Sequence, residues 1–132
     1  ILIKGIQTVE DALIAVDSGV EAIAISNHGG RQLDEAPTPF DLLPEVAEAV
    51  QDRLEIICDG GARRGSDIVK AVSLGATAVM TGRPYLYALA ACGERGVDHV
   101  LGLLHEGVER TMALIGAVSM NDLSQELINR AD

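Results

Sequence analysis

A histidine and an arginine lie three residues apart in a glycine-flanked segment of this chain. The segment reads Ser26-Asn27-His28-Gly29-Gly30-Arg31 and follows a short apolar run. Its glycines and its position indicate that the histidine lies on a loop rather than on a helix. Because an imidazole titrates near neutral pH, His28 is a candidate proton acceptor. The planar guanidinium of Arg31 suits a carboxylate, so it could hold an acidic substrate in one orientation. The alternative interpretation is a pair of ordinary surface side chains.

Two further segments combine glycines with arginines. They are Asp59-Gly60-Gly61-Ala62-Arg63-Arg64-Gly65 and Thr81-Gly82-Arg83. Glycine lets the backbone and its N–H groups approach an anion, and arginine adds a bidentate fork suited to phosphate. Together the segments predict a phosphate site, against the alternative of two ordinary turns with solvated arginines. The candidate residues are Asp59, Gly60, Gly61, Ala62, Arg63, Gly82 and Arg83.

Lys4 follows the apolar run at residues 1–3, at the predicted end of a buried strand. A lysine is costly to bury without a partner. It is therefore either an ordinary lysine at the rim of a sheet or a cation placed against an electron-rich cofactor. His99 and His105 fall in a later helical stretch and are expected to face solvent.

Four short apolar runs must position these polar segments, because each segment follows one run. Strands are expected at residues 1–3, 22–25, 55–58 and 78–80, and helices at 8–19, 40–50, 67–74, 85–92, 97–115 and 121–128. Thr8 and Ser66 are the predicted N-caps of the first and third helices. The spacing at 16–23 repeats at 72–79, which suggests that a βαβ unit occurs twice.

Alternating apolar strands and helices predict an α/β fold with a parallel sheet buried on both faces. Four such units make half of a (β/α)8 TIM barrel, whose active sites lie at the carboxyl ends of the strands. We expect residues 1–132 to form one such half, about strands 5–8, with the amino-terminal half missing. The chain starts without Met, as though cut in mid-fold.

Composition limits the function classes. Net charge is −10, which disfavours nucleic-acid binding. The sequence holds no apolar run of about 18 residues, so no transmembrane helix is predicted. Cys58 and Cys92 lack metal-site spacing, and both are interpreted as small buried residues of a reduced, cytoplasmic protein. No metal is expected.

The string Ser26-Asn27-His28-Gly29-Gly30-Arg31-Gln32-Leu33-Asp34 closely resembles the active-site segment of FMN-dependent 2-hydroxy-acid oxidases and dehydrogenases, the family of glycolate oxidase, lactate oxidase and mandelate dehydrogenase. Asp59-Gly60-Gly61-x-Arg63-Arg64-Gly65 and Gly82-Arg83-Pro84 resemble its flavin phosphate loops, and Ile3-Lys4-Gly5 resembles its flavin-contacting lysine segment. The resemblance covers nearly the whole chain, and the histidine string is its most specific part.

This resemblance implies oxidation of a small L-2-hydroxy acid to the 2-oxo acid, with FMN as cofactor. His28 would be the base, and Arg31 would bind the substrate carboxylate beside it. Lys4 would stabilise negative charge on the reduced flavin, Ser26 would hydrogen-bond the flavin, and Asp59 would bind the ribityl chain. The phosphate region would fall to Gly60, Gly61, Ala62, Arg63, Gly82 and Arg83. Family members are often tetramers, which implies a homo-oligomer.

Two alternatives stay open. Some relatives oxidise a peptide-derived substrate in redox-cofactor (mycofactocin-type) biosynthesis, and their motifs would look the same. The chain could also be an inactive structural half-barrel. The family's histidine-orienting aspartate and substrate-contacting tyrosines come from segments that are not in this sequence. The isolated chain is therefore expected to bind FMN poorly and to be inactive. The electron acceptor is left open.

Overall fold

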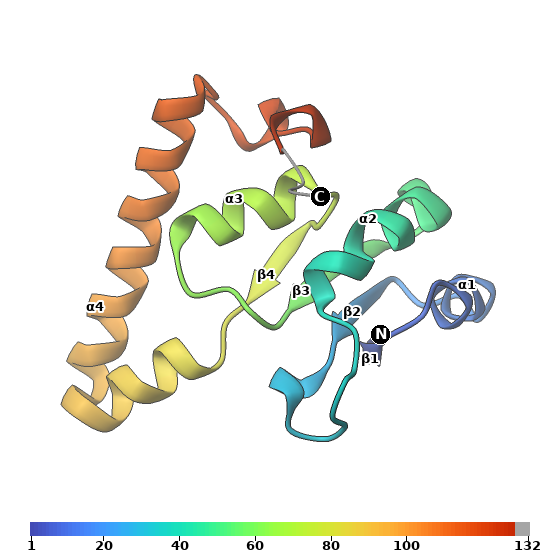
Figure 1. Cartoon of the computed structure of the whole chain (residues 1–132), viewed down its shortest axis with the longest axis horizontal. Coiled ribbons are helices and arrows are strands. Elements are labelled where there is room, and N and C mark those ends of the chain that lie inside the picture. Colours follow the sequence, from blue (N-terminus) through green and yellow to red (C-terminus); the bar gives the residue numbers. More distant parts are fainter. Residues whose placement is uncertain (129–132) are drawn as a thin grey trace.

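The computed structural model describes residues 1–128 and contains a four-stranded parallel sheet in the order β1-β2-β3-β4. The strands are β1 (Leu2–Ile6), β2 (Ala22–Ser26), β3 (Glu55–Asp59) and β4 (Ala78–Met80). Helices α1 (Val9–Asp17), α2 (Pro39–Val50) and α3 (Gly65–Ser73) connect them, and α4 (Arg83–Ile115) follows β4. The predicted strand–helix alternation is therefore confirmed, and Figure 1 shows the helices arranged beside the strands, with α4 next to α3.

The apolar core lies between the sheet and the three connecting helices. Ile23 and Ile25 of β2 and Ile56 and Cys58 of β3 alternate along their strands with residues that face the opposite side. They pack against apolar side chains of the helices, which are Ala12, Ala15, Leu43, Val46, Val50, Ala71 and Leu74. Burial, with a smaller effect of the neighbouring Asp59 charge, raises the pKa of the Cys58 thiol to about 12. Cys58 is thus a buried, protonated core residue, as predicted.

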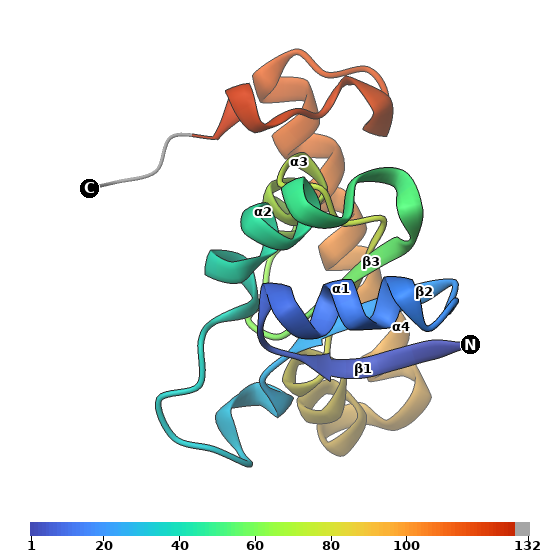
Figure 2. The same cartoon turned by 90° about the vertical axis from the view of Figure 1, so that its right-hand side faces the viewer.

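The prediction that all four strands are buried on both faces is correct only for β2, where every residue is buried. Ile1, Leu2 and Ile3 are 86%, 40% and 37% exposed, because β1 pairs only with β2 within residues 1–128. Figure 2 shows β1 at the margin of the sheet with α1 alongside it. The strand β4 forms the other edge. Apolar runs identified these strands but did not reveal that two of them are edges.

The start of α3 also differs from the prediction. Ser66 was expected to cap the helix, but the helix begins at Gly65 with Arg64 as its N-cap residue. The carboxylate of Asp67 accepts hydrogen bonds from the backbone N–H groups of Arg63 and Arg64, at 2.9 Å each. The aspartate in the first turn thus reaches back to the N–H groups of the N-cap residue and of the residue before it, rather than a serine capping the N–H groups that follow.

The carboxy-terminal third is helical only in part. The long α4 is interrupted at Cys92 and Gly93, close to the predicted break between two helices. Cys92 is exposed, so its predicted burial is wrong. The helix predicted at 121–128 is also wrong, since two short 3-10 turns stand there, Met120–Asp122 and Gln125–Leu127. His99 and His105 are exposed, as predicted.

No helix between residues 1 and 128 has both the length and the apolar character needed to span a membrane.

Candidate active site

A cavity of about 350 Å³ lies at the carboxyl ends of the strands, and it collects most of the residues singled out in the sequence. Its lining includes Lys4, His28, Arg31, Asp59, Gly60, Gly61, Gly82 and Arg83, together with Gly29, Gln32 and Met80. Ser26 and Ala62 lie buried beside it rather than in its lining. Arg63 lines a neighbouring hollow that it shares with Arg83, Pro84 and Tyr87.

Lys4 was predicted to end its strand, but it lies within β1. An irregularity in the pairing with β2 follows it directly. The register with β2 shifts between Lys4 and Ile6. Gly5 occupies this point with a φ of +101°, which an L side chain rarely adopts. A Cβ at Gly5 would also lie 3.3 Å from Cε1 of His28. The glycine at this irregularity therefore leaves room for the imidazole of His28.

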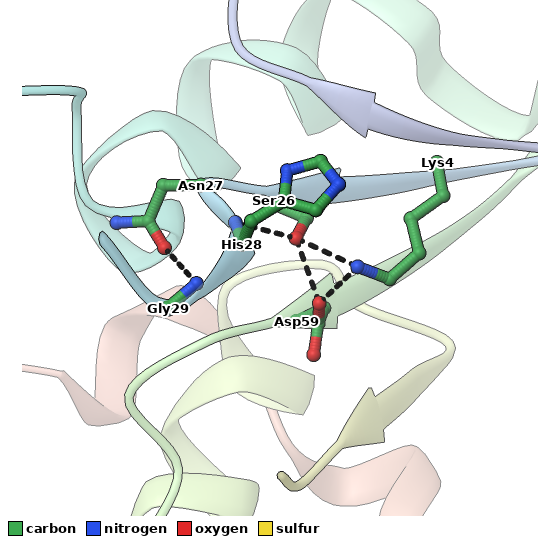
Figure 3. Close-up of polar contacts among 6 residues, drawn as sticks. All are labelled: Lys4, Ser26, Asn27, His28, Gly29 and Asp59. Atoms are coloured by element: carbon green, nitrogen blue, oxygen red, sulfur yellow. Dashed lines mark hydrogen bonds and ion pairs between the residues drawn. The ribbon is translucent and has the colours of Figure 1, made fainter. Parts of the chain in front are cut away.

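Ser26, at the end of β2, connects three of these residues through its hydroxyl (Figure 3). The hydroxyl oxygen accepts hydrogen bonds from Lys4 Nζ at 2.9 Å and from the backbone N–H of His28 at 3.1 Å. It donates its own proton to Asp59 Oδ2 at 2.7 Å. Lys4 Nζ lies 2.5 Å from the same carboxylate oxygen. The cation, the carboxylate and the histidine loop are thus held by one network.

The pKa of Asp59 reflects this network. Partial burial raises the pKa of the carboxyl group, but hydrogen bonds from Lys4 and Ser26 and the charges of Lys4 and His28 lower it. The lowering effects prevail, so the pKa of Asp59 lies below its ordinary value of 3.8. Asp59 is therefore ionised at neutral pH.

His28 is held in an uncommon backbone conformation. It opens a 3-10 turn, His28–Gly30, in which the φ angles are +54°, +69° and +71°. A positive φ is unfavourable for residues other than glycine, so other contacts must hold the histidine there. Besides the bond to Ser26, the side-chain oxygen of Asn27 accepts from the N–H of Gly29 at 3.0 Å. His28 is exposed and lines the cavity, where a substrate can reach it.

Two glycines of the first loop, Gly60 and Gly61, could not be replaced by other residues without strain. Gly60 has a φ of +130°, and a Cβ there would lie 3.2 Å from Asn27 Oδ1 and from Pro39 Cγ. Gly61 has a φ of +91°. The hydroxyl of Thr81 donates to the carbonyl of Ala62 at 3.4 Å and so joins the two glycine loops. The loops thus contribute glycine backbone to the cavity at Gly60, Gly61 and Gly82, and side chains at Asp59 and Arg83.

The cavity lining is rich in positive charge, although the chain as a whole is negatively charged. Lys4, Arg31 and Arg83 line it with Asp59 as their counter-charge, whereas the whole chain carries −10. Arg83 also donates a hydrogen bond to the carbonyl of Gly29 at 3.5 Å, which ties the second glycine loop to the histidine turn. A cationic, glycine-floored cavity fits anionic ligands such as a phosphate and a carboxylate. The residues present therefore fit a phosphorylated cofactor.

Sequence reasoning missed two supporting residues, Asn27 and Asp67. Asn27 caps the histidine turn, and Asp67 occupies the N–H groups of Arg63 and Arg64. Those two N–H groups are therefore not free to bind an anion. The guanidinium of Arg63 is the group of this residue that could do so. The Asn-x-Gly spacing is typical of a side chain that caps its own turn and could have identified Asn27. The role of Asp67 depended on where α3 starts.

Comparison with known proteins supports the resemblance. A family model described as FMN-dependent dehydrogenase matches residues 1–130. A pre-mycofactocin synthase of Mycobacterium tuberculosis is 52% identical over 93% of this chain and 31% of its own length. A peroxisomal (S)-2-hydroxyacid oxidase of Arabidopsis thaliana is 51% identical over 95% of this chain and 34% of its own. The chain thus spans about a third of the length of these relatives.

A solved structure of a mandelate oxidase variant with a monooxide FMN adduct superposes with a TM-score of 0.89. It is 48% identical and covers 92% of this chain and 39% of its own. The fold is therefore that of part of a TIM barrel, as predicted. The FMN prediction is confirmed for the family, both by its description and by this adduct.

Proposed function

The chain belongs to the family of FMN-dependent dehydrogenases, and from this premise we propose that the whole protein oxidises a small L-2-hydroxy acid to the 2-oxo acid. The observation that supports this most strongly is the shared cavity. His28 and Arg31 line it together with Lys4 and the glycine loops. A base, a carboxylate clamp and an anion site thus lie around one space, which is what oxidation of a 2-hydroxy acid beside a phosphorylated cofactor needs.

Two side chains act on the substrate. Arg31 binds the carboxylate through its guanidinium and so presents the CH–OH carbon to His28. The imidazole of His28 accepts a proton from that centre, and its exposure at the cavity allows the proton to pass on to solvent. When bound, FMN supplies the acceptor for the two electrons that leave the substrate.

The cofactor is held by the rest of the predicted set. Lys4 would place its ammonium beside the bound flavin and would stabilise negative charge there. Asp59 would bind the ribityl chain. The phosphate region is bound by the glycine loops and two guanidinium groups, which are Gly60, Gly61, Ala62, Arg63, Gly82 and Arg83. The positive φ angles of Gly60 and Gly61 and the cationic lining of the cavity support this assignment.

A second candidate function is oxidation of a peptide-derived substrate in redox-cofactor biosynthesis. It is favoured by the identity of 52% to a pre-mycofactocin synthase, which is as high as the identity to the hydroxy-acid oxidase. Both functions would use the same proton acceptor and the same cofactor site. They differ in the group that Arg31 would bind. Every 2-hydroxy acid offers it a carboxylate next to the reacting carbon, which a peptide-derived substrate need not do.

The surroundings of the site belong to the proposal as well. The edges β1 and β4 have open sides in the described part of the chain, and a further part of the same protein would close the barrel there. Residues 1–132 alone would then bind FMN weakly and show little or no activity. Assembly as a homo-oligomer and a cytoplasmic location stay predictions, and the Arabidopsis relative is peroxisomal.

The decisive experiment is a flavin spectrum of the full-length protein. The purified protein should be yellow, and lactate, glycolate or mandelate should bleach it in the absence of oxygen. Bleaching by a peptide-derived substrate alone would support the second function. A colourless protein that FMN cannot reconstitute would contradict both and support a purely structural role.

A further inference from the structure

Asn27 lies directly before the histidine turn but outside the lining of the cavity. The lining contains His28, Gly29 and Arg31, whereas the half-buried Asn27 is not part of it. A ligand in the cavity would therefore contact the turn from one side, and Asn27 contacts it from the protein side. The side chain of Asn27 can act on the site only through its neighbours.

The side chain and the backbone of Asn27 both hold the turn His28–Gly30. Its Oδ1 accepts a hydrogen bond from the N–H of Gly29 at 3.0 Å, and its carbonyl oxygen accepts one from the N–H of Gly30, also at 3.0 Å. Figure 3 shows this side chain turned back onto Gly29, away from the hydroxyl of Ser26. All three residues of the turn have positive φ angles, so the turn needs such bonds to persist.

The same amide group also contacts two segments beyond the turn. Its Nδ2 donates a hydrogen bond to the carbonyl of Pro37 at 3.4 Å, in the loop before α2. On the other side lies Gly60, where a Cβ would approach both Asn27 Oδ1 and Pro39 Cγ to 3.2 Å. The absent side chain of Gly60 gives the amide its space. Asn27 thus lies among the histidine turn, the loop that leads to α2 and the glycine loop after β3.

We propose that Asn27 is a positioning residue that fixes the proton acceptor His28 and the carboxylate clamp Arg31 relative to each other. Only Gly29 and Gly30 separate the two groups, and glycine has more backbone freedom than any other residue. A misplacement of about 1 Å between reacting groups can slow a reaction about a hundredfold. The two glycines must therefore be held from outside, and the bonds of Asn27 hold them. This inference rests on the proposed function and adds to it a residue that touches neither substrate nor cofactor.

Asn27→Ala in the full-length protein tests the proposal, because it removes the amide and leaves the backbone. In the cofactor-free protein, hydrogen exchange of the Gly29 N–H should rise about tenfold, the size expected for one lost hydrogen bond. With FMN bound, anaerobic reduction by a 2-hydroxy acid should slow about tenfold to a hundredfold, and the apparent substrate affinity should fall about tenfold. FMN affinity should stay unchanged, because Asn27 is not in the lining. Unchanged exchange, or fast exchange with an unchanged reduction rate, would overturn the proposal.

Asn27→Asp separates the two bonds of the amide. A carboxylate still accepts from the Gly29 N–H but cannot donate to the carbonyl of Pro37. It also raises the pKa of a nearby imidazole, so reduction rates are compared on the plateau at high pH. Slow exchange and a reduction rate close to that of the wild type are expected. Slow exchange with slow reduction would show that holding the turn is not enough, and it would contradict the proposal. Should Asn27→Ala fail to fold, these two values in Asn27→Asp decide the question.

Asn121 provides the matched control. It is an exposed asparagine in another 3-10 turn, Met120–Asp122, and it lies outside the cavity lining. Asn121→Ala should leave the exchange of the Gly29 N–H, the reduction rate and the FMN affinity unchanged. Equal slowing in both alanine variants would assign the effect to general loosening and overturn the proposal.

Failure of this inference differs from failure of the proposed function. If neither a hydroxy acid nor a peptide-derived substrate reduces the flavin of the wild type, the proposed function fails, and the pairing of base and clamp fails with it. Exchange of the Gly29 N–H in the cofactor-free proteins then still shows whether Asn27 holds the turn. If the wild type is reduced and Asn27→Ala is reduced at the same rate, only the role of Asn27 is wrong.

Discussion

Lys4 and Asp59 form an ion pair between two strands that are not neighbours. Lys4 lies on β1 and Asp59 on β3, with β2 between them, yet Lys4 Nζ approaches Asp59 Oδ2 to 2.5 Å. The lysine crosses over β2 at Ser26, which bonds to both partners. The edge strand is therefore tied to the second interior strand at the rim of the cavity.

This ion pair predicts a dependence of stability on pH. The pKa of Asp59 is lowered in the folded state, so its stabilising effect is fully present above the unfolded pKa and is lost as pH falls through the folded pKa. Asp59→Asn should therefore lower the free energy of unfolding at neutral pH, and the difference from the wild type should shrink between about pH 5 and about pH 3. Urea unfolding of both proteins across this range measures it.

Asp17 is the control for this prediction, because it is an exposed carboxylate at the end of α1. Asp17→Asn should change the free energy of unfolding little at any pH. A stability difference for Asp59→Asn that stays constant down to pH 3 would show that the carboxylate charge is not what stabilises the fold.

A close backbone contact between α3 and α4 gives the second prediction. A Cβ at Gly65 would lie 2.1 Å from the backbone nitrogen of Val108 and 2.2 Å from the carbonyl carbon of Gly107. Gly65→Ala should push the helices apart at the end of the Asp59–Gly65 loop, with a loss of about 1–3 kcal/mol in stability. Thermal unfolding measures the loss, and FMN titration shows whether the loop is displaced.

Gly102 of α4 is the matched glycine, since a Cβ there would meet nothing within 4 Å in the described structure. Gly102→Ala should be neutral or raise stability by about 0.5–1 kcal/mol, because alanine is the better helix former. If Gly65→Ala and Gly102→Ala have the same stability, the packing of α3 against α4 does not require a glycine at position 65.

The sequence predicted the interior of this fold better than its edges. The run Ala22–Ile25 is apolar and ends at the histidine segment, so β2 and its place in the core followed directly. Burial of β1 did not follow, because the same apolar pattern serves an edge strand. The helix expected at 121–128 failed because its residues pack little: most are exposed, and only local turns form.

The candidate site shows the same division. Polar segments after parallel strands were expected at one rim, and they line one cavity. The partners within that rim depend on geometry that no local pattern contains. The ladder of β1 is irregular directly after Lys4, and the register of β2 and β3 pairs Ser26 with Asp59. Residue types therefore identified the groups, whereas their pairings needed the register of three strands.

Arg31→Lys in the full-length protein is the third prediction. An ammonium cannot reproduce the two parallel hydrogen bonds that a guanidinium makes with a carboxylate. The apparent substrate affinity should fall about tenfold to a hundredfold, while FMN binding stays unchanged. Steady-state kinetics with a 2-hydroxy acid measure it. Arg110→Lys, at an exposed position of α4, is the control. Unchanged affinity and turnover in Arg31→Lys would count against a role in holding the substrate.

His28→Asn is the sharpest test of the chemistry, because asparagine tolerates the positive φ of this turn better than most residues. The variant should keep its backbone and its FMN but lose the proton acceptor, so anaerobic flavin reduction should slow by about 10²–10⁴-fold. His99→Asn, an exposed histidine on α4 outside the cavity lining, should reduce at the wild-type rate. Stopped-flow absorbance of the flavin measures both. A near-normal rate in His28→Asn would mean that the proton goes elsewhere. The shared cavity would then no longer support an oxidation that depends on this imidazole.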